Sequence, residues 1–504
     1  VKLLGTSVDS IRKGEDREKF RQLMIDLGQP IPESKIIEDM DRGLAFAKEI
    51  GFPVIIRPAY TLGGAGGGFA HDEEELKSIL KKGLALSPIH QVLVERSIKG
   101  WKEVEYEVMR DENDTCIIVC NMENMDPVGV HTGDSIVVAP TQTLSDEQNQ
   151  ILRNASLQVI RALHVVGGCN IQFAFHPTSN EYYIIEVNPR VSRSSALASK
   201  ATGYPIARIA TKCAIGYHLD EIVNPMTRDS FASFEPAIDY IIVKLPRFPF
   251  DKFSEGDRSL GTQMKATGEV MAIDRSFEGA LNKGLRSLEI NLHSLHSPSI
   301  AEKSDEELEA LLKTATDLRI FAIAAALERG YSLESVQELT EISPWFLRKI
   351  KKMLAREEAL STYSWDRLPN EDLKAAKEMN MGDRRLAEIF HISERQVRDK
   401  CKELGIRPSY KMVDSCAGEF DAVTPYFYST YKGADEVDVS ECKEKILVIG
   451  SGPIRIGQGI EFDYCSVQAA LAVKKMGYEA VVINNNPETV STDYTVADKL
   501  YFEP

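Results

Sequence analysis

Three oxygen-bearing side chains stand close together in two neighbouring apolar runs. Gln172 lies in the run Ile171–Phe175, and Glu186 and Asn188 lie at the end of the run that begins at Tyr183. Side chains two apart on a β-strand point to the same face, so a hairpin partner would bring Gln172 beside the other two. One carboxylate and two amide carbonyls suit Mg²⁺ or Mn²⁺ bound together with nucleotide phosphates. On spacing alone, the polar face of an antiparallel hairpin is an equally good interpretation.

A second motif joins a cation to a glycine-rich segment. Arg57 ends the run Phe52–Pro58, and the segment Thr61–Gly68 that follows is mostly glycine. Backbone N–H groups of such a loop can bind phosphate oxygens while the guanidinium neutralises their charge. The Gly-Lys-Ser/Thr ending of a P-loop is missing, and the dinucleotide fingerprint does not fit. We therefore expect a cover for a triphosphate; the alternative is a mobile surface loop beside a solvated arginine. Arg190 has the same parity as Glu186 and could hold an anion beside the metal ions.

The elements that must position these residues change in type along the chain. From residue 35 to about 290, helical periodicity alternates with short apolar runs, which predicts mixed α/β structure; the runs are 54–56, 92–94, 116–119, 171–175 and 183–187. From about Ser297 to Gly405 the pattern predicts helices only, opened by a capping box at Ser304 and Glu307. Residues 410–439 are predicted to form a polar connector, and 445–449 to start a new βαβ unit.

The composition excludes several classes of protein. The chain has 504 residues, of which 43% are hydrophobic and 27% charged, and a net charge of −16. These values exclude disordered, collagen-like and disulfide-stapled chains, and the sequence contains no apolar run long enough to span a membrane. The acidic balance argues against nonspecific binding to nucleic acid or to an anionic membrane. We expect a cytoplasmic protein with reduced cysteines and no zinc. The start without Met and the end after a strand-like run suggest a fragment.

Two further patterns have a competing interpretation. Residues 386–400 scan as a helix-turn-helix capped by Ser393, but the second helix mixes acidic and basic side chains, so DNA binding is disfavoured. Gly450–Pro453 follows a strand as a dinucleotide loop would, but Arg455 stands at the third glycine position, which argues against NAD.

These segments together resemble one known family. Phe52–Pro58, Gly63–Gly68 and Ile185–Ser195 resemble the ATP-grasp half of the carbamoyl phosphate synthase large subunit. The resemblance is reinforced by three more segments, Trp101–Glu107, His131–Ser135 and Gly452–Cys465. It extends over essentially the whole chain and is loosest in the helical middle.

The resemblance implies a fold of three parts. Residues 1–290 would form an α/β (α+β) ATP-grasp domain that makes carboxyphosphate, with its first residues a linker from a missing domain. Residues 291–442 would form an all-α helical oligomerisation domain, and 443–504 a partial Rossmann-like pre-ATP-grasp domain.

It also implies roles for individual residues. Gln172, Glu186 and Asn188 would bind two divalent ions, Arg190 and Arg57 would act in catalysis, and the ATP contacts would be Arg17, Arg57, Gly63, Gly64, Arg96, Ile98, Glu103, Gly129, Val130, His131, Gln172 and Glu186. Arg96 stands where the family often has an acidic residue, so contacts from Arg96 and Ile98 are expected mainly through the backbone.

The implied activity is the phosphorylation of bicarbonate by ATP, which starts carbamoyl phosphate synthesis for arginine and pyrimidines. The implied cofactors are Mg²⁺ or Mn²⁺, with K⁺ as a further candidate. The implied partners are a glutaminase subunit or domain that supplies ammonia, and a second copy bound through the helical domain. The enzymatic alternative is another ATP-grasp ligase or a biotin-carboxylase-like enzyme, and the non-enzymatic alternative is a helical DNA-binding or scaffold protein.

Overall fold

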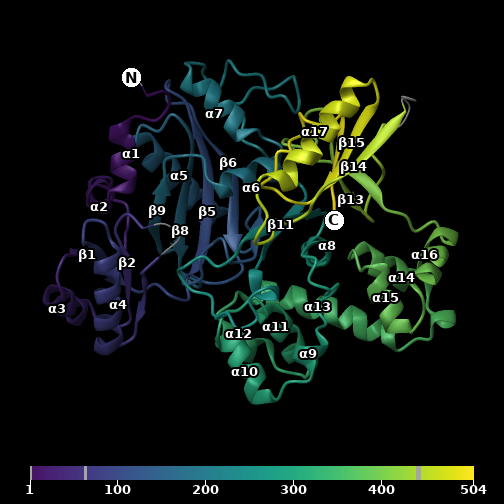
Figure 1. Ribbon diagram of the computed structural model, residues 1–504, viewed down its shortest axis with the longest axis horizontal. Coiled ribbons are helices and arrows are strands. Elements are labelled where there is room, and N and C mark those ends of the chain that lie inside the picture. The colour runs from purple at the N-terminus through teal and green to yellow at the C-terminus, as the bar shows by residue number, and fades with distance from the viewer. Residues whose placement is uncertain (1–2, 62–64, 439–443) are drawn as a thin grey trace.

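The computed structural model describes residues 3–61, 65–438 and 444–504. They form three sheets and a helical region (Figure 1). The strands of the two N-terminal sheets are β1 (Ser34–Ile37), β2 (Val54–Pro58), β3 (Gly68–Ala70), β4 (Val92–Arg96), β5 (Lys102–Arg110), β6 (Cys116–Asn124), β7 (Val137–Ala139), β8 (Gly167–Phe175), β9 (Tyr182–Asn188), β10 (Ile241–Arg247) and β11 (Gly268–Asp274). Their helices are α1 (Val8–Glu15), α2 (Arg17–Asp26), α3 (Met40–Ile50), α4 (Glu73–Leu86), α5 (Asp146–Ala162), α6 (Arg193–Thr202), α7 (Ile206–Ala214), η1 (Pro249–Asp251) and α8 (Phe277–Ser287).

The rest of the chain is a helical region followed by a third sheet. The helices are α9 (Pro298–Ala301), α10 (Asp305–Lys313), α11 (Arg319–Glu328), α12 (Leu333–Thr340), α13 (Pro344–Ser361), η2 (Trp365–Arg367), α14 (Asn370–Glu378), α15 (Asp383–Phe390), α16 (Glu394–Glu403) and α17 (Glu461–Lys475). The strands are β12 (Ser409–Met412), β13 (Tyr426–Thr430), β14 (Lys445–Ile449), β15 (Glu479–Asn484) and β16 (Lys499–Phe502).

The smallest sheet has four antiparallel strands in the order β1-β4-β2-β3. Val54 and Ile56 alternate with less buried neighbours and pack under α3 and α4. Both helices begin at an aspartate cap, Asp39 and Asp72, that accepts hydrogen bonds from the first turn. This sheet therefore holds Arg57, at position four of β2, beside the glycine-rich segment that follows.

The central sheet has seven antiparallel strands in the order β11-β10-β7-β6-β5-β8-β9. One face packs against α5 through a core that includes Tyr106, Ile171 and Phe173. The apolar runs of the sequence correctly predicted β2, β4, β6, β8 and β9. The hairpin of β8 and β9 lies at one edge of this sheet and carries the polar side chains of interest.

The helical region matches its prediction closely. The capping box at Ser304 and Glu307 begins α10, and Ser393 caps α16. Residues 320–327 lie in α11, where every side chain from Arg319 to Leu327 is buried. None of the helices in the described part of the chain combines the length and apolar character that crossing a membrane requires.

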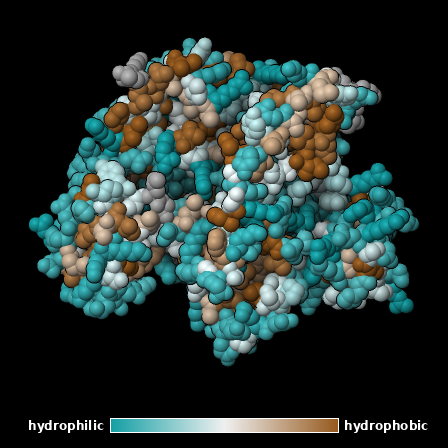
Figure 2. Space-filling model, in the orientation of Figure 1, coloured by the Kyte–Doolittle hydropathy of each residue, from teal (hydrophilic) through white to brown (hydrophobic). Residues whose placement is uncertain are grey.

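The third sheet corrects one expectation. Residues 410–439 were predicted to be a polar connector, but β12 and β13 lie in this segment and extend the sheet in the order β12-β13-β16-β15-β14. Both are short, and β12 is only partly buried, so the periodicity that would mark a strand is weak. The predicted βαβ unit is present as β14, α17 and β15. Apolar side chains of β14 are exposed, and they coincide with a brown area in Figure 2.

Candidate functional site

The β8–β9 hairpin brings the three predicted oxygen donors together. Gln172 on β8 is the register partner of Glu186 on β9, and Asn170 is the partner of Asn188. The register shifts beyond Gln172, so that Phe173 faces Ile184. The Asn188 side-chain amide donates a hydrogen bond to the Glu186 carboxylate at 3.1 Å. The strand parity on which the sequence argument depended is therefore present in the fold.

Arg57 connects this hairpin to the small sheet. Its guanidinium lies 3.3 Å from Glu186 and 3.4 Å from Glu95 of β4, and its side chain is 20% exposed. Burial would lower the pKa of Arg57, but Glu95, Glu186 and Glu103 outweigh burial and raise the pKa above its ordinary value. Arg57 is thus held as a cation between two sheets.

A second cation lies at the start of α2. Burial and the nearby charge of Arg57 lower the pKa of Arg17 to about 10, which leaves it charged at neutral pH. The Asp16 carboxylate caps α2 by accepting from the backbone N–H groups of Glu18 and Lys19. Two arginines from different elements therefore interact electrostatically with the same carboxylate, Glu186.

The Glu186 carboxylate is ionised at neutral pH. Burial would raise its pKa, but Arg57, Asn188 and Arg17 outweigh burial and lower the pKa below its ordinary value. A carboxylate opposite an amide carbonyl suits a hard divalent ion, and rotation of the Asn188 amide would present its oxygen instead of its nitrogen. The residues present therefore fit a divalent ion. Among the residues the structure describes, no group of three His, Cys, Asp or Glu side chains is placed to hold a metal.

A row of buried carboxylates lies on the strand beside this hairpin, and sequence reasoning named only its first member, Glu103. Glu103, Glu105 and Glu107 alternate along β5 and are at most 7% exposed. The Asn170 amide donates to Glu105 at 3.0 Å and to Glu107 at 2.9 Å. The Ser195 hydroxyl at the start of α6 also donates to Glu107, at 2.8 Å. The signal was in the sequence, since acidic residues at every second position share one face of a strand.

Burial changes the protonation of these carboxylates. It raises the pKa of Glu103 to about 8 and that of Glu107 to about 8, helped by neighbouring carboxylates. It also raises the pKa of Glu105. Because Gln172 is the register partner of Glu105, this row lies directly beside the hairpin site.

The segment from Gly129 to His131 lies in the turn between β6 and β7. Gly129 has φ = +127°, a backbone conformation open mainly to glycine. The His131 backbone N–H donates to Gly261 O at 2.8 Å, and its Nδ1 accepts from the Gly133 N–H at 3.0 Å. Burial lowers the pKa of His131, so its imidazole is neutral at physiological pH. Val130 is buried between them.

Ile98 and Arg96, near the end of β4, lie in different surroundings. Ile98 is 8% exposed and belongs to a small apolar cluster with Val128 and Ala174, against which Trp101 and Tyr183 pack. By contrast, the Arg96 guanidinium pairs with Glu33 at 2.8 Å and its side chain is half-exposed. The Arg96 side chain therefore pairs with Glu33, and a backbone contact of Arg96 with ATP stays a prediction.

The remaining predicted residues are placed only in part. Gly63 and Gly64 lie outside the described residues. Beyond these two residues, Gly66 has φ = +76°. Gly68 is the first residue of β3 and pairs with Ile56 of β2. Arg190 follows β9; its side chain is 57% exposed and its Nε lies 3.9 Å from Glu15.

Three family models match the chain. They are described as carbamoyl-phosphate synthase L chain, ATP binding domain, over residues 16–222; carbamoyl-phosphate synthetase large chain, oligomerisation domain, over 269–405; and carbamoyl phosphate synthase preATP-grasp domain, over 442–504. Together with the two N-terminal sheets and the polar hairpin, these matches define the chain as an ATP-grasp protein.

Curated relatives are similar along the whole chain. A carbamoyl phosphate synthase arginine-specific large chain of Bacillus subtilis is 59% identical over 100% of this chain and 49% of its own length. The same protein of Halalkalibacterium halodurans is 58% identical over 100% of this chain and 48% of its own. The chain belongs to the carbamoyl phosphate synthase large-chain family and spans about half the length of these relatives.

The solved structures to which the chain is similar are more distant. The biotin carboxylase domain of a Hydrogenobacter thermophilus 2-oxoglutarate carboxylase has a TM-score of 0.47 at 18% identity, covering 56% of this chain and 67% of that one. A biotin carboxylase of Campylobacter jejuni has a TM-score of 0.46 at 16% identity, covering 65% of this chain and 74% of that one.

Proposed function

We propose that this protein phosphorylates bicarbonate with ATP to give carboxyphosphate and ADP, the first step of carbamoyl phosphate synthesis. The observation that carries the proposal is the meeting of Glu186 with Gln172, Asn188 and Arg57 at one hairpin. Family membership supports the choice of substrate, since the relatives are named as carbamoyl phosphate synthase large chains.

The proposed chemistry needs alignment and charge neutralisation rather than a protein nucleophile. A bicarbonate oxygen attacks the γ-phosphorus of ATP, the bond between that phosphorus and the β,γ-bridging oxygen breaks, and ADP leaves. Arg57 and Arg17 neutralise phosphate oxygens, and Arg190 binds the carboxyl group of the product. Divalent ions held by Gln172, Glu186 and Asn188 would neutralise further charge on the phosphates. The buried thiol of Cys169 takes no part, because burial raises its pKa well above the ordinary value.

The proposal includes further nucleotide contacts. Glu103 would accept a hydrogen bond from a ribose hydroxyl, and the His131 turn would face the nucleotide beside it. Ile98 and its apolar cluster would give the adenine ring a flat surface, with Arg96 contributing through its backbone. Gly63 and Gly64 would close over the triphosphate and exclude water, because carboxyphosphate hydrolyses readily.

The wider biological setting is also part of the proposal. We propose three parts, 1–290, 291–442 and 443–504, with self-association through the helical part, which matches the oligomerisation model. Ammonia would come from a glutaminase subunit or domain, and the product would serve arginine synthesis, as the relatives' names indicate. Mg²⁺ or Mn²⁺, K⁺ as an additional ion and a cytoplasmic location complete the proposal.

An isotope experiment tests the reaction at the level of one bond. The protein is incubated with ATP, Mg²⁺ and ¹⁸O-labelled bicarbonate, and the inorganic phosphate is analysed by mass. Carboxyphosphate breaks down to CO₂ and phosphate with its P–O bond intact, so one ¹⁸O per phosphate is expected. Bicarbonate-stimulated ADP release without ¹⁸O in the phosphate would contradict the proposal, and carboxylation of free biotin would favour the alternative enzyme.

A further inference from the structure

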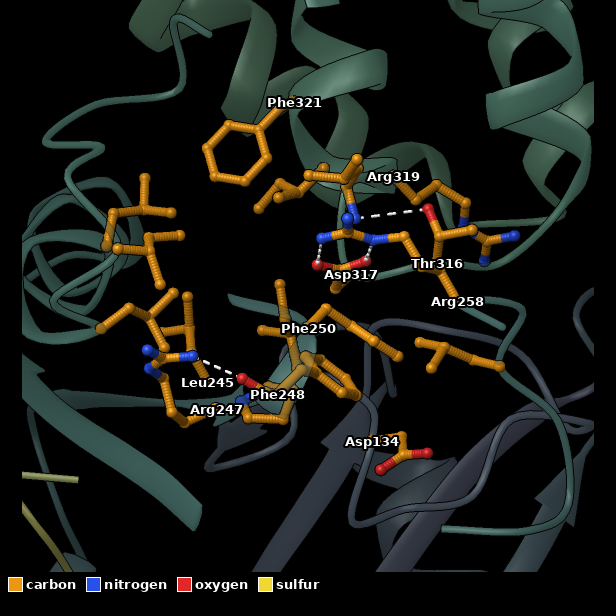
Figure 3. A pocket seen from close by; sticks show the side chains of 18 of the residues that line it. Asp134, Leu245, Arg247, Phe248, Phe250, Arg258, Thr316, Asp317, Arg319 and Phe321 are labelled. Carbon is orange, nitrogen blue, oxygen red and sulfur yellow. Dashed lines mark hydrogen bonds and ion pairs between the residues drawn. The ribbon is translucent and has the colours of Figure 1, made fainter. Parts of the chain in front are cut away.

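A cavity of about 350 Å³ lies away from the hairpin site, between the central sheet and the helical region. Its walls come from the turn around Met125 and Ile136, the end of β10, the end of α8 and the start of α11. None of the residues predicted to contact ATP or metal lines it. In Figure 3, Phe248 and Phe250 lie across the cavity from Phe321 and the helices.

Most of the wall is apolar. Phe248 and Phe250 stack with their ring centroids 5.6 Å apart, and leucines from α8 and isoleucines from α11 complete the surface. A volume in this range is that of a pocket for a small organic molecule. Asp251 is 44% exposed and Arg258 is 37% exposed, so these two residues mark the side that opens to solvent.

The charged side chains of the wall already neutralise one another. Arg258 makes two hydrogen bonds to Asp317, at 2.9 and 2.7 Å, and Arg319 reaches Asp126 at 2.6 Å. Arg247 is bonded to Asp251 in the same two-point manner. The remaining lining carboxylate, Asp134, accepts backbone N–H groups of Lys265 and Ala266. An anion entering this cavity would find each lining arginine already paired, a cation would find only Asp134, which two backbone N–H groups already solvate, and either ion would lose its hydration.

Two donors in the wall nevertheless lack acceptors. Among the residues that the structure describes, the Nε–H groups of Arg247 and Arg319 have no hydrogen-bond partner, although both side chains are at least 92% buried, with exposures of 5% and 8%. An unsatisfied buried N–H costs free energy that an acceptor on a bound molecule would recover. What the wall lacks is therefore an oxygen acceptor rather than a charge.

We propose that this cavity binds an uncharged small molecule with an apolar body and a carbonyl-type oxygen that accepts from Arg247 or Arg319. The site is separate from the ATP site and does not depend on the function proposed above.

A matched series of probes tests the head group. Binding of 4-phenylbutanamide, 4-phenylbutanoate and 4-phenylbutylamine, which share one apolar body, is measured by isothermal titration calorimetry on the whole chain. The amide is expected to bind saturably and at least about tenfold more tightly than the acid or the amine. Absence of saturable amide binding, or an acid that binds as tightly as the amide, would overturn the proposal.

Variants then locate the site. Arg247→Lys and Arg319→Lys keep the positive charge but remove Nε, and each is expected to weaken amide binding, by about tenfold where that donor is used. Arg258→Lys is the matched control, since its Nε already donates to Asp317, and it should change the affinity less than threefold.

Leu260→Trp, at the partly exposed rim, should abolish binding by filling the opening. Amide binding that survives Leu260→Trp, or that neither Nε deletion weakens more than the control does, would place the probe elsewhere and overturn the proposal. Circular dichroism spectra confirm that each variant is folded.

Discussion

Two buried regions of this molecule differ in whether their ionisable side chains are paired with an opposite charge. Along β5, Glu103, Glu105 and Glu107 are buried close together, and burial raises the pKa of each. At the junction with the helical region, by contrast, buried arginines are matched one to one with carboxylates, as in Arg319 with Asp126. The first region gathers carboxyl groups whose protonated form burial favours, and the second pairs opposite charges.

The difference distinguishes a region suited to ionic ligands from an interface whose charges are already paired. Uncompensated carboxylates cost folding free energy, which evolution tolerates where cations or substrates bind. Balanced pairs satisfy the hydrogen-bonding needs of an interface and carry no free charge toward a ligand. The β5 and β9 region is therefore the place to expect ionic ligands, and the helical junction the place to expect uncharged ones.

The largest expected effect is at Glu186. Glu186→Gln removes the only ionised member of the proposed ligand set, so Mn²⁺ should bind at least about 100-fold more weakly in the presence of a non-hydrolysable ATP analogue. Electron paramagnetic resonance titration measures free Mn²⁺ directly. Glu74→Gln, at a carboxylate that is 84% exposed, is the control and should stay within twofold of the unmodified protein. Equal Mn²⁺ affinities of the Glu186→Gln and Glu74→Gln proteins would contradict the distinction between an ionic site and the paired charges of the helical junction.

The next effect is on stability at the helical junction. Asp126→Leu leaves Arg319, with a side chain 8% exposed, without its counter-ion, and should lower the free energy of unfolding by about 3 kcal/mol. Urea denaturation followed by fluorescence of Trp345 and Trp365, both in the helical region, measures this change. The double variant Asp126→Leu/Arg319→Leu should be more stable than the single one. If the double variant is the less stable, the pair is not an isolated structural unit.

A smaller effect concerns pH. Burial raises the pKa of Glu107 to about 8, so the folded protein holds a proton that the unfolded chain loses above about pH 4.5. This contribution to stability is complete below the unfolded pKa and is lost as pH rises through the folded pKa, with a slope of at most about 1.4 kcal/mol per pH unit. Urea denaturation at pH 6, 7 and 8 should therefore show a shallower decline for Glu107→Gln than for the unmodified protein. Parallel profiles would show that Glu107 is ionised in the fold.

The smallest effect is at an exposed pair. Arg395 and Asp399 on α16 lie 3.6 Å apart with 89% and 60% of their side chains exposed. Arg395→Gln should change the free energy of unfolding by less than about 0.5 kcal/mol, because solvent screens such pairs. The same urea experiment measures this change. A loss of unfolding free energy as large as that of Asp126→Leu would mean that burial does not explain the difference between the two ion pairs.

The sequence predicted the elements that carry the site better than the contacts within it. The strands containing Arg57, Gln172 and Glu186 were visible as short apolar runs, and strand parity placed Glu186 and Asn188 on one face. The contact of Arg57 with Glu95 was not visible, because it requires the pairing of β2 with β4, whose residues are far apart in the chain. A local sequence pattern can predict that a segment forms a strand, whereas the strand with which it pairs depends on the whole fold.

Other features left weaker signals. β12 was missed because it is short and only partly buried throughout, and β13 because it is short and almost wholly buried, so neither strand alternates between buried and exposed positions. Asn170 stands next to an apolar run, and nothing local shows that it bridges Glu105 and Glu107. The cavity beside Phe250 is built from several segments spread between residues 125 and 342, so no window of sequence contains it.

The central claim is that Glu186, Gln172 and Asn188 hold divalent ions against the phosphates of ATP. A crystal structure with Mn²⁺ and a non-hydrolysable ATP analogue tests it directly, because anomalous scattering locates the metal independently of the protein. We predict manganese within about 2.2 Å of oxygens of Glu186 and Gln172, with the Asn188 amide turned to present its oxygen. Manganese bound elsewhere, with Asn188 still donating to Glu186, would contradict the account.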